Sequence, residues 1–154
     1  MSGGGPSVEV DAEPAGGYGR LLVVVDASAW AKRAVEHTCE LARRSGGEVL
    51  VLHVRSLIQE RDGAATALES EYHVQRLLAK ERSIFKRNGI VAAFETRSAH
   101  LLHVAEKIVE VAAQWGADVI VMGSQGHSGA PGLVPGRTAR KLLRLTTLPV
   151  IVID

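Results

Sequence analysis

A glycine-rich segment between positions 123 and 136 carries the strongest chemical signal in the chain. An apolar run that predicts a strand ends at Gly123, and a run that predicts a helix starts at Gly136. Glycines let backbone N–H groups approach an anion closely, and successive amides form a concave nest around it. The start of a helix adds unpaired donors and the positive end of its dipole. A turn is enough to explain one glycine, but the whole set in this position predicts a phosphate-binding loop.

Two familiar phosphate-binding motifs do not fit this segment. A P-loop that ends at Gly136 needs its first glycine at position 131, which is Pro131, and a lysine where Arg137 stands. The glycine fingerprint of dinucleotide-binding proteins is missing after the first predicted strand. The spacing therefore excludes both standard nucleotide-binding motifs.

Apolar runs and helical periodicities alternate along the chain. Strands are predicted over residues 21–26, 48–54, 90–96, 118–123 and 149–153. Helices are predicted over residues 28–45, 66–88, 101–115 and 136–145. This alternation favours an α/β fold with a parallel sheet, right-handed crossovers and helices on both faces. The ligand crevice of such a sheet lies at the carboxyl ends of its strands, where Asp26 and Gly123 are expected.

The composition is that of one ordinary globular domain. The chain has 154 residues, of which 46% are hydrophobic and 23% charged, which is enough for a single core. A formal charge of +1 argues against a protein that coats nucleic acid or an anionic membrane. One cysteine, Cys39, excludes an internal disulfide, and no apolar run approaches the ~20 residues of a membrane helix. We expect a cytoplasmic protein with neither a membrane nor a nucleic-acid partner.

The charge is unevenly distributed along the chain. Residues 1–19 hold three acidic side chains, no basic one and six of the sixteen glycines. Such a segment buries too little apolar surface to offset its ordering entropy, so a disordered tail is predicted there. The predicted domain, residues 20–154, then carries 18 basic and 14 acidic side chains, a net charge of +4.

A basic run follows the glycine-rich segment and comprises Arg137, Arg140, Lys141 and Arg144. On a helix these cations form either a solvated face or a field that attracts phosphate, and the sequence leaves both open. His127 in the loop is either a phosphate donor or an exposed residue. His100 and His103 share a predicted helix face, but no cluster of Cys or carboxylates completes a metal site. We therefore predict neither catalytic nor metal-binding residues.

Four segments share their residue pattern with one known family. They are Val25-Asp26-Ala27-Ser28, Leu52-His53-Val54, the run from Asp118 to Gly129, and Leu148-Pro149-Val150-Ile151-Val152. Together they resemble the universal stress proteins, from residue 20 to the end of the chain. ATP-binding members of that family have a glycine, two residues, a glycine, nine residues, and a glycine followed by Ser or Thr. The spacing of Gly123, Gly126 and Gly136 matches this pattern in full.

The resemblance implies a fold and a ligand. The implied fold is a single-domain, Rossmann-like sandwich of the adenine nucleotide alpha hydrolase type, with a five-stranded parallel sheet in the order 3-2-1-4-5. The implied ligand is ATP, accompanied by Mg²⁺. By similarity, Asp26 contacts the ribose with Val24 nearby, Val54 meets adenine through its backbone, and Met122 lines the pocket.

The resemblance also assigns the phosphate contacts, with one departure. Gly123, Gly126 and Gly136 bring amides to the phosphates, and Thr138 lies in the same segment. Arg137 stands where the family has Ser or Thr. A forked cation pairs well with phosphate, but its bulk also obstructs a site built around a hydroxyl. The sequence leaves both effects open.

The resemblance finally implies a homodimer formed through the C-terminal strand, because an apolar strand at a sheet edge offers unpaired backbone groups. The leading interpretation is an ATP-binding regulatory module in a stress response. The alternatives are a regulatory or structural homodimer that binds no nucleotide and a slow ATPase or phosphotransferase.

Overall fold

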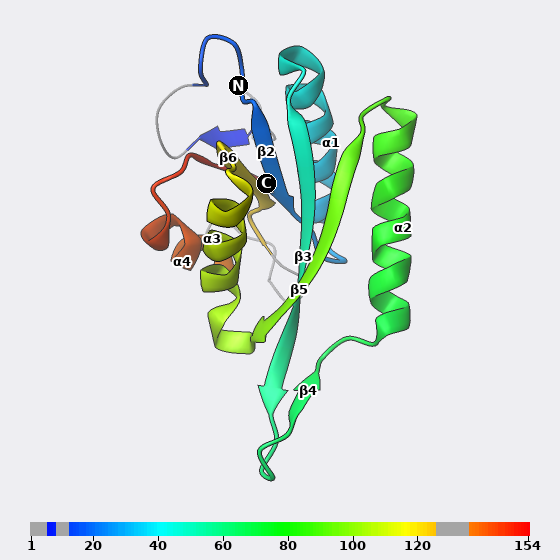
Figure 1. The fold of residues 1–154 in the computed structure, drawn as a ribbon, viewed down its shortest axis with the longest axis vertical. Helices are drawn as coiled ribbons and strands as arrows, with labels where there is room; N and C mark the ends of the chain where they lie inside the picture. The colour runs from blue at the N-terminus through cyan, green and yellow to red at the C-terminus, as the bar shows by residue number, and fades with distance from the viewer. Residues whose placement is uncertain (1–5, 9–12, 126–135) are drawn as a thin grey trace.

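The computed structural model describes residues 6–8, 13–125 and 136–154. Its helices are α1 (Ala29–Ser45), α2 (Glu71–Arg87), α3 (Val104–Trp115) and α4 (Arg137–Leu145), with a short 3₁₀ turn, η1 (Leu101–His103). The five longer strands are β2 (Arg20–Val24), β3 (Glu48–Gln59), β5 (Ala92–His100), β6 (Val119–Gly123) and β7 (Val150–Ile153). Two three-residue strands, β1 (Pro6–Val8) and β4 (Ala65–Ala67), complete the elements shown in Figure 1.

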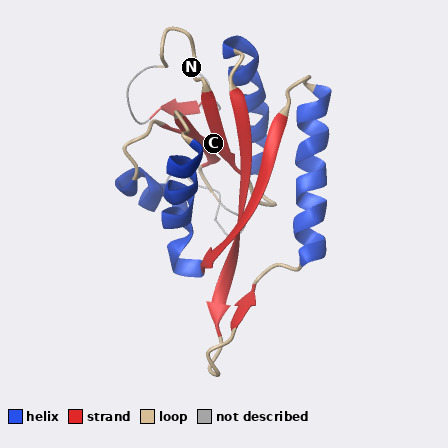
Figure 2. Ribbon diagram, in the orientation of Figure 1, coloured by secondary structure: helices blue, strands red, loops and turns tan. Residues whose placement is uncertain are grey.

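The five longer strands form the parallel core of one sheet (Figure 2). They lie in the order β5-β3-β2-β6-β7, so the strands predicted from sequence are arranged as 3-2-1-4-5. The predicted order is therefore confirmed. β2 lies at the centre, where it pairs with β3 on one side and β6 on the other.

Two helices cover each face of the sheet, and each face has its own apolar cluster. The first cluster joins Val23 and Val35 to Phe85, and so packs α1 and α2 against one face. The second joins Leu22 to Ile108 and Leu142, and so packs α3 and α4 against the other face. Alternate residues of β2 point to opposite faces, which is why a continuous apolar run suits a strand covered on both sides.

Two short antiparallel strands join the predicted five-stranded parallel sheet and extend it to seven strands. The helix predicted over residues 66–88 begins only at Glu71. Ser70 is its N-cap, and the Ser70 side chain accepts a hydrogen bond from the amide of His73. Residues 65–67 instead form β4 and pair antiparallel with the end of β3. β3 is longer than predicted: it reaches Gln59, and its last three residues, 57–59, pair with β4. The resulting hairpin projects beyond the helices in Figure 1.

The prediction of a disordered tail over residues 1–19 is wrong at two places. β1 pairs antiparallel with β7, with Pro6 opposite Ile153 and Val8 opposite Ile151. Tyr18 is 2% exposed and belongs to the first apolar cluster. Backbone pairing at a free sheet edge and burial of one aromatic ring therefore order parts of a segment whose composition alone predicts disorder. Residues 1–5 and 9–12 lie outside the described residues.

A buried carboxyl group lies on the α2 side of the sheet. Glu81 is 2% exposed, and its Oε2 has no hydrogen-bond partner within the described residues. The pKa of Glu81 is raised to about 7, chiefly by burial; the charges of Asp26 and Glu36 add to this rise, and those of Lys80 and Lys32 oppose it. The folded protein therefore holds this proton far more tightly than the unfolded chain does.

Because Glu81 loses its proton as pH rises, the free energy of unfolding is expected to fall with rising pH. Because the folded-state pKa lies above the ordinary carboxyl value of 4.5, the stabilisation is complete below about pH 4.5 and is lost as pH rises to about 7. The loss is on the order of 3 kcal/mol, at ~1.4 kcal/mol for each pKa unit.

Glu81→Gln removes this ionisation with little change of shape. Chemical denaturation across pH 5–8 is expected to show a flatter profile for Glu81→Gln than for the wild type. Glu60→Gln, at an exposed position of the hairpin, serves as the matched control and keeps the wild-type profile. A wild-type profile in Glu81→Gln as well contradicts the assignment.

Candidate functional site

The carboxyl ends of β2 and β6 lie side by side at one edge of the parallel core, next to the middle of β3. The parallel register sets Val24 beside Leu52 and Val23 beside Val121, and β3 continues past this level to Gln59. Asp26 follows β2, Val54 lies in β3, and Met122 and Gly123 end β6. α4 starts at the same edge, because Gly136 at its N-cap is bonded to Ser124, the residue after β6. The structure therefore brings most of the predicted site residues together.

Asp26 is held in a defined position by the start of α1. Its Oδ1 accepts the amide of Ser28 at 2.8 Å, and the Ser28 hydroxyl accepts the amide of Ala31 at 3.2 Å to cap the helix. The Asp26 side chain is half-buried. A carboxylate accepts hydrogen bonds from several donors at once, and ligand hydroxyl groups are suitable donors.

Apolar side chains from three strands lie beside Asp26 on one face of the sheet. Val54 and Met122, each 7% exposed, belong to the cluster under α3 and α4, and the half-buried Val24 packs against the same cluster. The family resemblance implied that Val24 lies near the ribose, that Val54 meets adenine through its backbone and that Met122 lines the pocket. The structure therefore places them on a common face, in a position to meet a flat apolar group.

Gly123 has a packing role that the sequence did not reveal. A Cβ at this position lies only 2.5 Å from the Cβ of Trp30 and 2.9 Å from its carbonyl carbon. The end of β6 and the first turn of α1 approach so closely that only glycine fits. Close packing of α1 thus accounts for this glycine with or without a ligand.

Gly136 closes the base of the glycine-rich loop. Its amide donates a hydrogen bond to the carbonyl of Ser124, which joins the start of α4 to the end of β6. A Cβ at Gly136 lies 3.3 Å from the same carbonyl oxygen, which is tighter than ordinary contact. The amide of Gly136 is thus used inside the protein. Gly126 and His127, which were also predicted to contact phosphate, lie outside the described residues.

Within the described part of the chain, no side chain caps the N-terminus of α4, whose N-cap residue is Gly136. The first amides of a helix lack intrahelical partners, so they remain available to an acceptor. Arg137 is exposed and Thr138 half-buried in this first turn. An uncapped helix end beside an exposed arginine is suited to hold an anion.

The basic run along α4 does not act as one surface. Lys141 is engaged with α3, because its Nζ lies 2.7 Å from Glu106 Oε2 and donates to the carbonyl of Leu102 at 2.7 Å. The hydrogen bond from Lys141 to the Glu106 carboxylate is the main reason why the pKa of Glu106 falls to about 2. Arg137, Arg140 and Arg144 are exposed. One member of the run is therefore structural and three face solvent.

Ser124 is a residue of the site that sequence analysis missed. It is 3% exposed, and its hydroxyl has no hydrogen-bond partner among the described residues. A buried hydroxyl without a partner is uncommon and asks for an explanation, such as a missing ligand group. The only sequence signal is its position directly after β6, where the crevice of a parallel sheet is expected.

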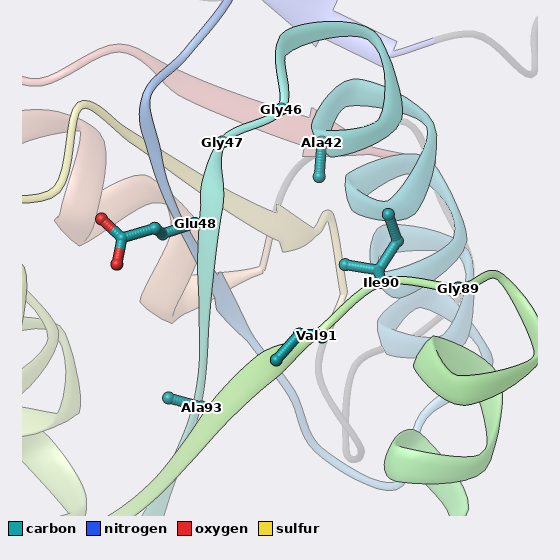
Figure 3. Close-up of a pocket in the computed structure, with 8 residues that line it drawn as sticks. All are labelled: Ala42, Gly46, Gly47, Glu48, Gly89, Ile90, Val91 and Ala93. Atoms are coloured by element: carbon teal, nitrogen blue, oxygen red, sulfur yellow. The ribbon is translucent and has the colours of Figure 1, made fainter.

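A second hollow lies at the opposite, amino-terminal edge of the sheet (Figure 3). It has a volume of about 430 Å³ and lies where α1 passes into β3 and α2 into β5, lined by Ala42, Gly46, Gly47, Glu48, Gly89, Ile90, Val91 and Ala93. Glu48 is the only ionisable residue of this lining, and its carboxylate points away from Ile90 in Figure 3. An acidic lining is unsuited to phosphate.

The remaining polar groups suggest no further centre. Within residues 6–8, 13–125 and 136–154, no group of three His, Cys, Asp or Glu side chains is placed to hold a metal ion. The His100 and His103 rings lie 5.7 Å apart, and His103 is bonded to Glu106 at 3.2 Å. Cys39 is buried, which raises the pKa of its thiol to about 11. No helix in the described part of the chain is long and apolar enough to cross a membrane.

An open parallel sheet with polar groups gathered at its carboxyl edge defines a large class of α/β proteins with the ligand site at a topological switch point. The chain belongs to the universal stress protein family, whose family model matches residues 17–154. It is 24% identical over 148 residues to the universal stress protein YxiE of Bacillus subtilis, a match that covers 88% of this chain and 99% of YxiE.

Solved structures of the family share this fold. The universal stress protein UspA of Lactobacillus plantarum is 19% identical with a TM-score of 0.71, over 94% of this chain and all of that protein. The universal stress protein of Archaeoglobus fulgidus in complex with dAMP is 25% identical with a TM-score of 0.68, over 89% of this chain and 98% of that protein. The resemblance inferred from sequence is therefore confirmed, and the family includes a nucleotide complex.

Proposed function

We propose that this universal stress protein binds ATP at the carboxyl edge of its sheet. The observation that carries the proposal is the convergence of Asp26, the buried Ser124 hydroxyl and the uncapped start of α4 at one place. The dAMP complex of the Archaeoglobus fulgidus relative supports an adenine nucleotide as the ligand. The Ser124 hydroxyl, which has no hydrogen-bond partner among the described residues, and the first amides of α4 fit a phosphate chain, and the apolar face fits a base.

Each part of the nucleotide has matching groups in the chain. Val24, Val54 and Met122 offer the apolar face for adenine, and Asp26 accepts from the ribose hydroxyls. We assign the phosphates to the start of α4, the Ser124 hydroxyl and the glycine-rich loop, including Gly123, Gly126 and His127. Because the Gly136 amide already binds Ser124, the amides of Arg137 and Thr138 serve in its place. Mg²⁺ bound to the phosphates supplies charge neutralisation.

The proposed role is that of a regulatory binding module in the cytoplasm. Among the described residues, the site offers no lysine that clamps phosphate and no evident base to activate water. The site lies where the end of β6 meets α4 and α1. The regulatory signal is then whether nucleotide occupies this site. The buried, free Cys39 suits a reducing compartment.

The predicted homodimer needs the free edge of β7, but β1 of the same molecule already pairs with that edge. The edge of β7 that is remote from β6 pairs with β1 of the same molecule. We propose that two copies pair through β7 when β1 leaves it. β1 spans only three residues, and Pro6 has no amide hydrogen to donate. A tethered strand of this kind competes mainly through its high effective concentration.

The nucleotide site is tested by calorimetry with ATP and Mg²⁺. Asp26→Ala removes the ribose acceptor and is expected to weaken binding by at least about tenfold, as for loss of a hydrogen bond to a charged group. Glu48→Gln alters the ionisable group at the opposite hollow and serves as the matched control, with unchanged affinity. Absence of heat with the wild type at ~1 mM ATP contradicts the proposal and leaves a dimer that binds no nucleotide.

The effect of Arg137 is tested by Arg137→Ser, which restores the residue type of ATP-binding relatives. Because Arg137 is exposed in the first turn of α4, we expect it to pair with phosphate without filling the site. The substitution should weaken ATP binding about fivefold or more and reduce its dependence on salt. Arg144→Ser, at the other end of the helix, serves as control. Tighter binding by Arg137→Ser means that the arginine obstructs the site.

The role of β1 is tested by deleting residues 1–12. The deletion bares the edge of β7, and we expect the shortened chain to dimerise about tenfold more tightly than the full chain. Sedimentation velocity over a concentration series measures both constants. The full chain with Ser7→Pro and Val8→Pro, which lacks those strand amides, should behave like the deletion. Equal dimerisation of all three proteins contradicts competition by β1.

A further inference from the structure

A buried histidine joins the Asp26 turn to the segment before α2. His53 lies on β3 and is 2% exposed. Its Nδ1 is 2.8 Å from the carbonyl oxygen of Val25, and its Nε2 is 2.8 Å from Glu69 Oε1. Both ring nitrogens therefore have oxygen partners at hydrogen-bond distance.

These two contacts fix where the protons lie. The Val25 carbonyl can only accept, so Nδ1 carries a hydrogen. Nε2 faces a carboxylate oxygen, and a lone pair there would repel the lone pairs of Glu69. A hydrogen bond between Nε2 and Oε1 therefore needs a second proton. A pair bonded in this way holds one proton more than a neutral imidazole beside an ionised carboxylate.

The surroundings allow this proton to exchange with solvent. The His53 side chain is 3% exposed, whereas that of Glu69 is 31% exposed. Arg55 on the same strand donates to the Glu69 carbonyl at 2.9 Å and contacts Glu71 of α2 at 3.1 Å. On the β2 side, the charged residue Asp26 directly follows Val25 in the sequence. The pair thus lies among charges but opens to water only through Glu69.

The histidine supports the proposed nucleotide site through the backbone. The amide of Val25 donates to the carbonyl of Leu52 at 2.9 Å, while its carbonyl accepts from His53. Val25 is thus held at both ends by β3. The next residue is Asp26, whose carboxylate is bonded to the amide of Ser28. Fixing the Val25 carbonyl therefore fixes the turn from which Asp26 extends.

We propose that His53 and Glu69 form a proton-dependent pair that positions Asp26 for nucleotide binding. With the shared proton present, the pair holds the Val25–Asp26 turn. When the proton is lost, Nε2 and Glu69 repel each other and the turn loses this support, so nucleotide affinity falls as pH rises. His53 is a positioning residue, and this inference rests on the proposed ATP site.

The experiment measures ATP–Mg²⁺ affinity between pH 6 and pH 8.5 in a Glu81→Gln background, which removes the other buried proton near Asp26. The parent should lose about fivefold or more in affinity over this range. Added Glu69→Gln should make affinity nearly constant, because an amide N–H can donate to Nε2 of a neutral ring. Glu71→Gln is the matched control and keeps the parent profile. Identical profiles for Glu69→Gln and the parent overturn the proposal.

Two measurements without nucleotide separate this inference from the proposed function. Nitrogen-15 NMR of the His53 ring at pH 6 should show both nitrogens protonated in the parent. At pH 8, Glu69→Gln should show a proton on Nδ1 alone. Hydrogen exchange of the Ser28 amide should quicken with pH more steeply in the parent than in Glu69→Gln. If ATP fails to bind but these results hold, only the proposed function fails. An unprotonated Nε2 in the parent at pH 6 overturns the pair itself.

Discussion

The parallel pairing of β2 with β3 and β6 is the constraint on which the rest of the structure depends. It sets the carboxyl ends of β2 and β6 side by side, next to the middle of β3, and so gathers Asp26, Ser124 and the start of α4 at one edge. The same pairing turns alternate residues of β2 toward two apolar clusters, so each face must be covered by helices. Site and core are therefore consequences of one backbone arrangement, which explains why residues near the site also serve packing.

Gly123 and Gly136 illustrate this double service. Gly123 is required by the approach of Trp30, and the Gly136 amide is bonded to Ser124. The glycine pattern that predicts phosphate binding thus begins at a residue that lets α1 pack closely, Gly123, and ends at one that closes the loop, Gly136. The groups still available to an anion are a side-chain hydroxyl and the following helix amides. The motif builds the frame of the site, and residues beside it offer the donors.

Two polar arrangements lie on the α2 side of the Asp26 turn. Glu81 is buried, with an oxygen that has no hydrogen-bond partner among the described residues, and the buried His53 is bonded to Glu69. Burial raises the pKa of Glu81 because it disfavours the charged form. At the other end of the sheet order, β1 covers the apolar strand β7. Ionisable groups thus lie near the centre of the sheet, and the N-terminal segment occupies the edge formed by β7.

The sequence by itself determined the family and the five long strands, because apolar runs and helical periodicity are local and strong in this chain. The strand order and the site residues Val24, Val54 and Met122 came from the resemblance to that family, whereas Asp26 was singled out because ligands bind at the carboxyl ends of parallel strands. Tertiary structure alone decided the pairing of β1 and β4, the packing need at Gly123, the burial of Ser124 and the partners of His53. These features depend on contacts between residues far apart in the chain, and no local pattern of residue types encodes such a contact.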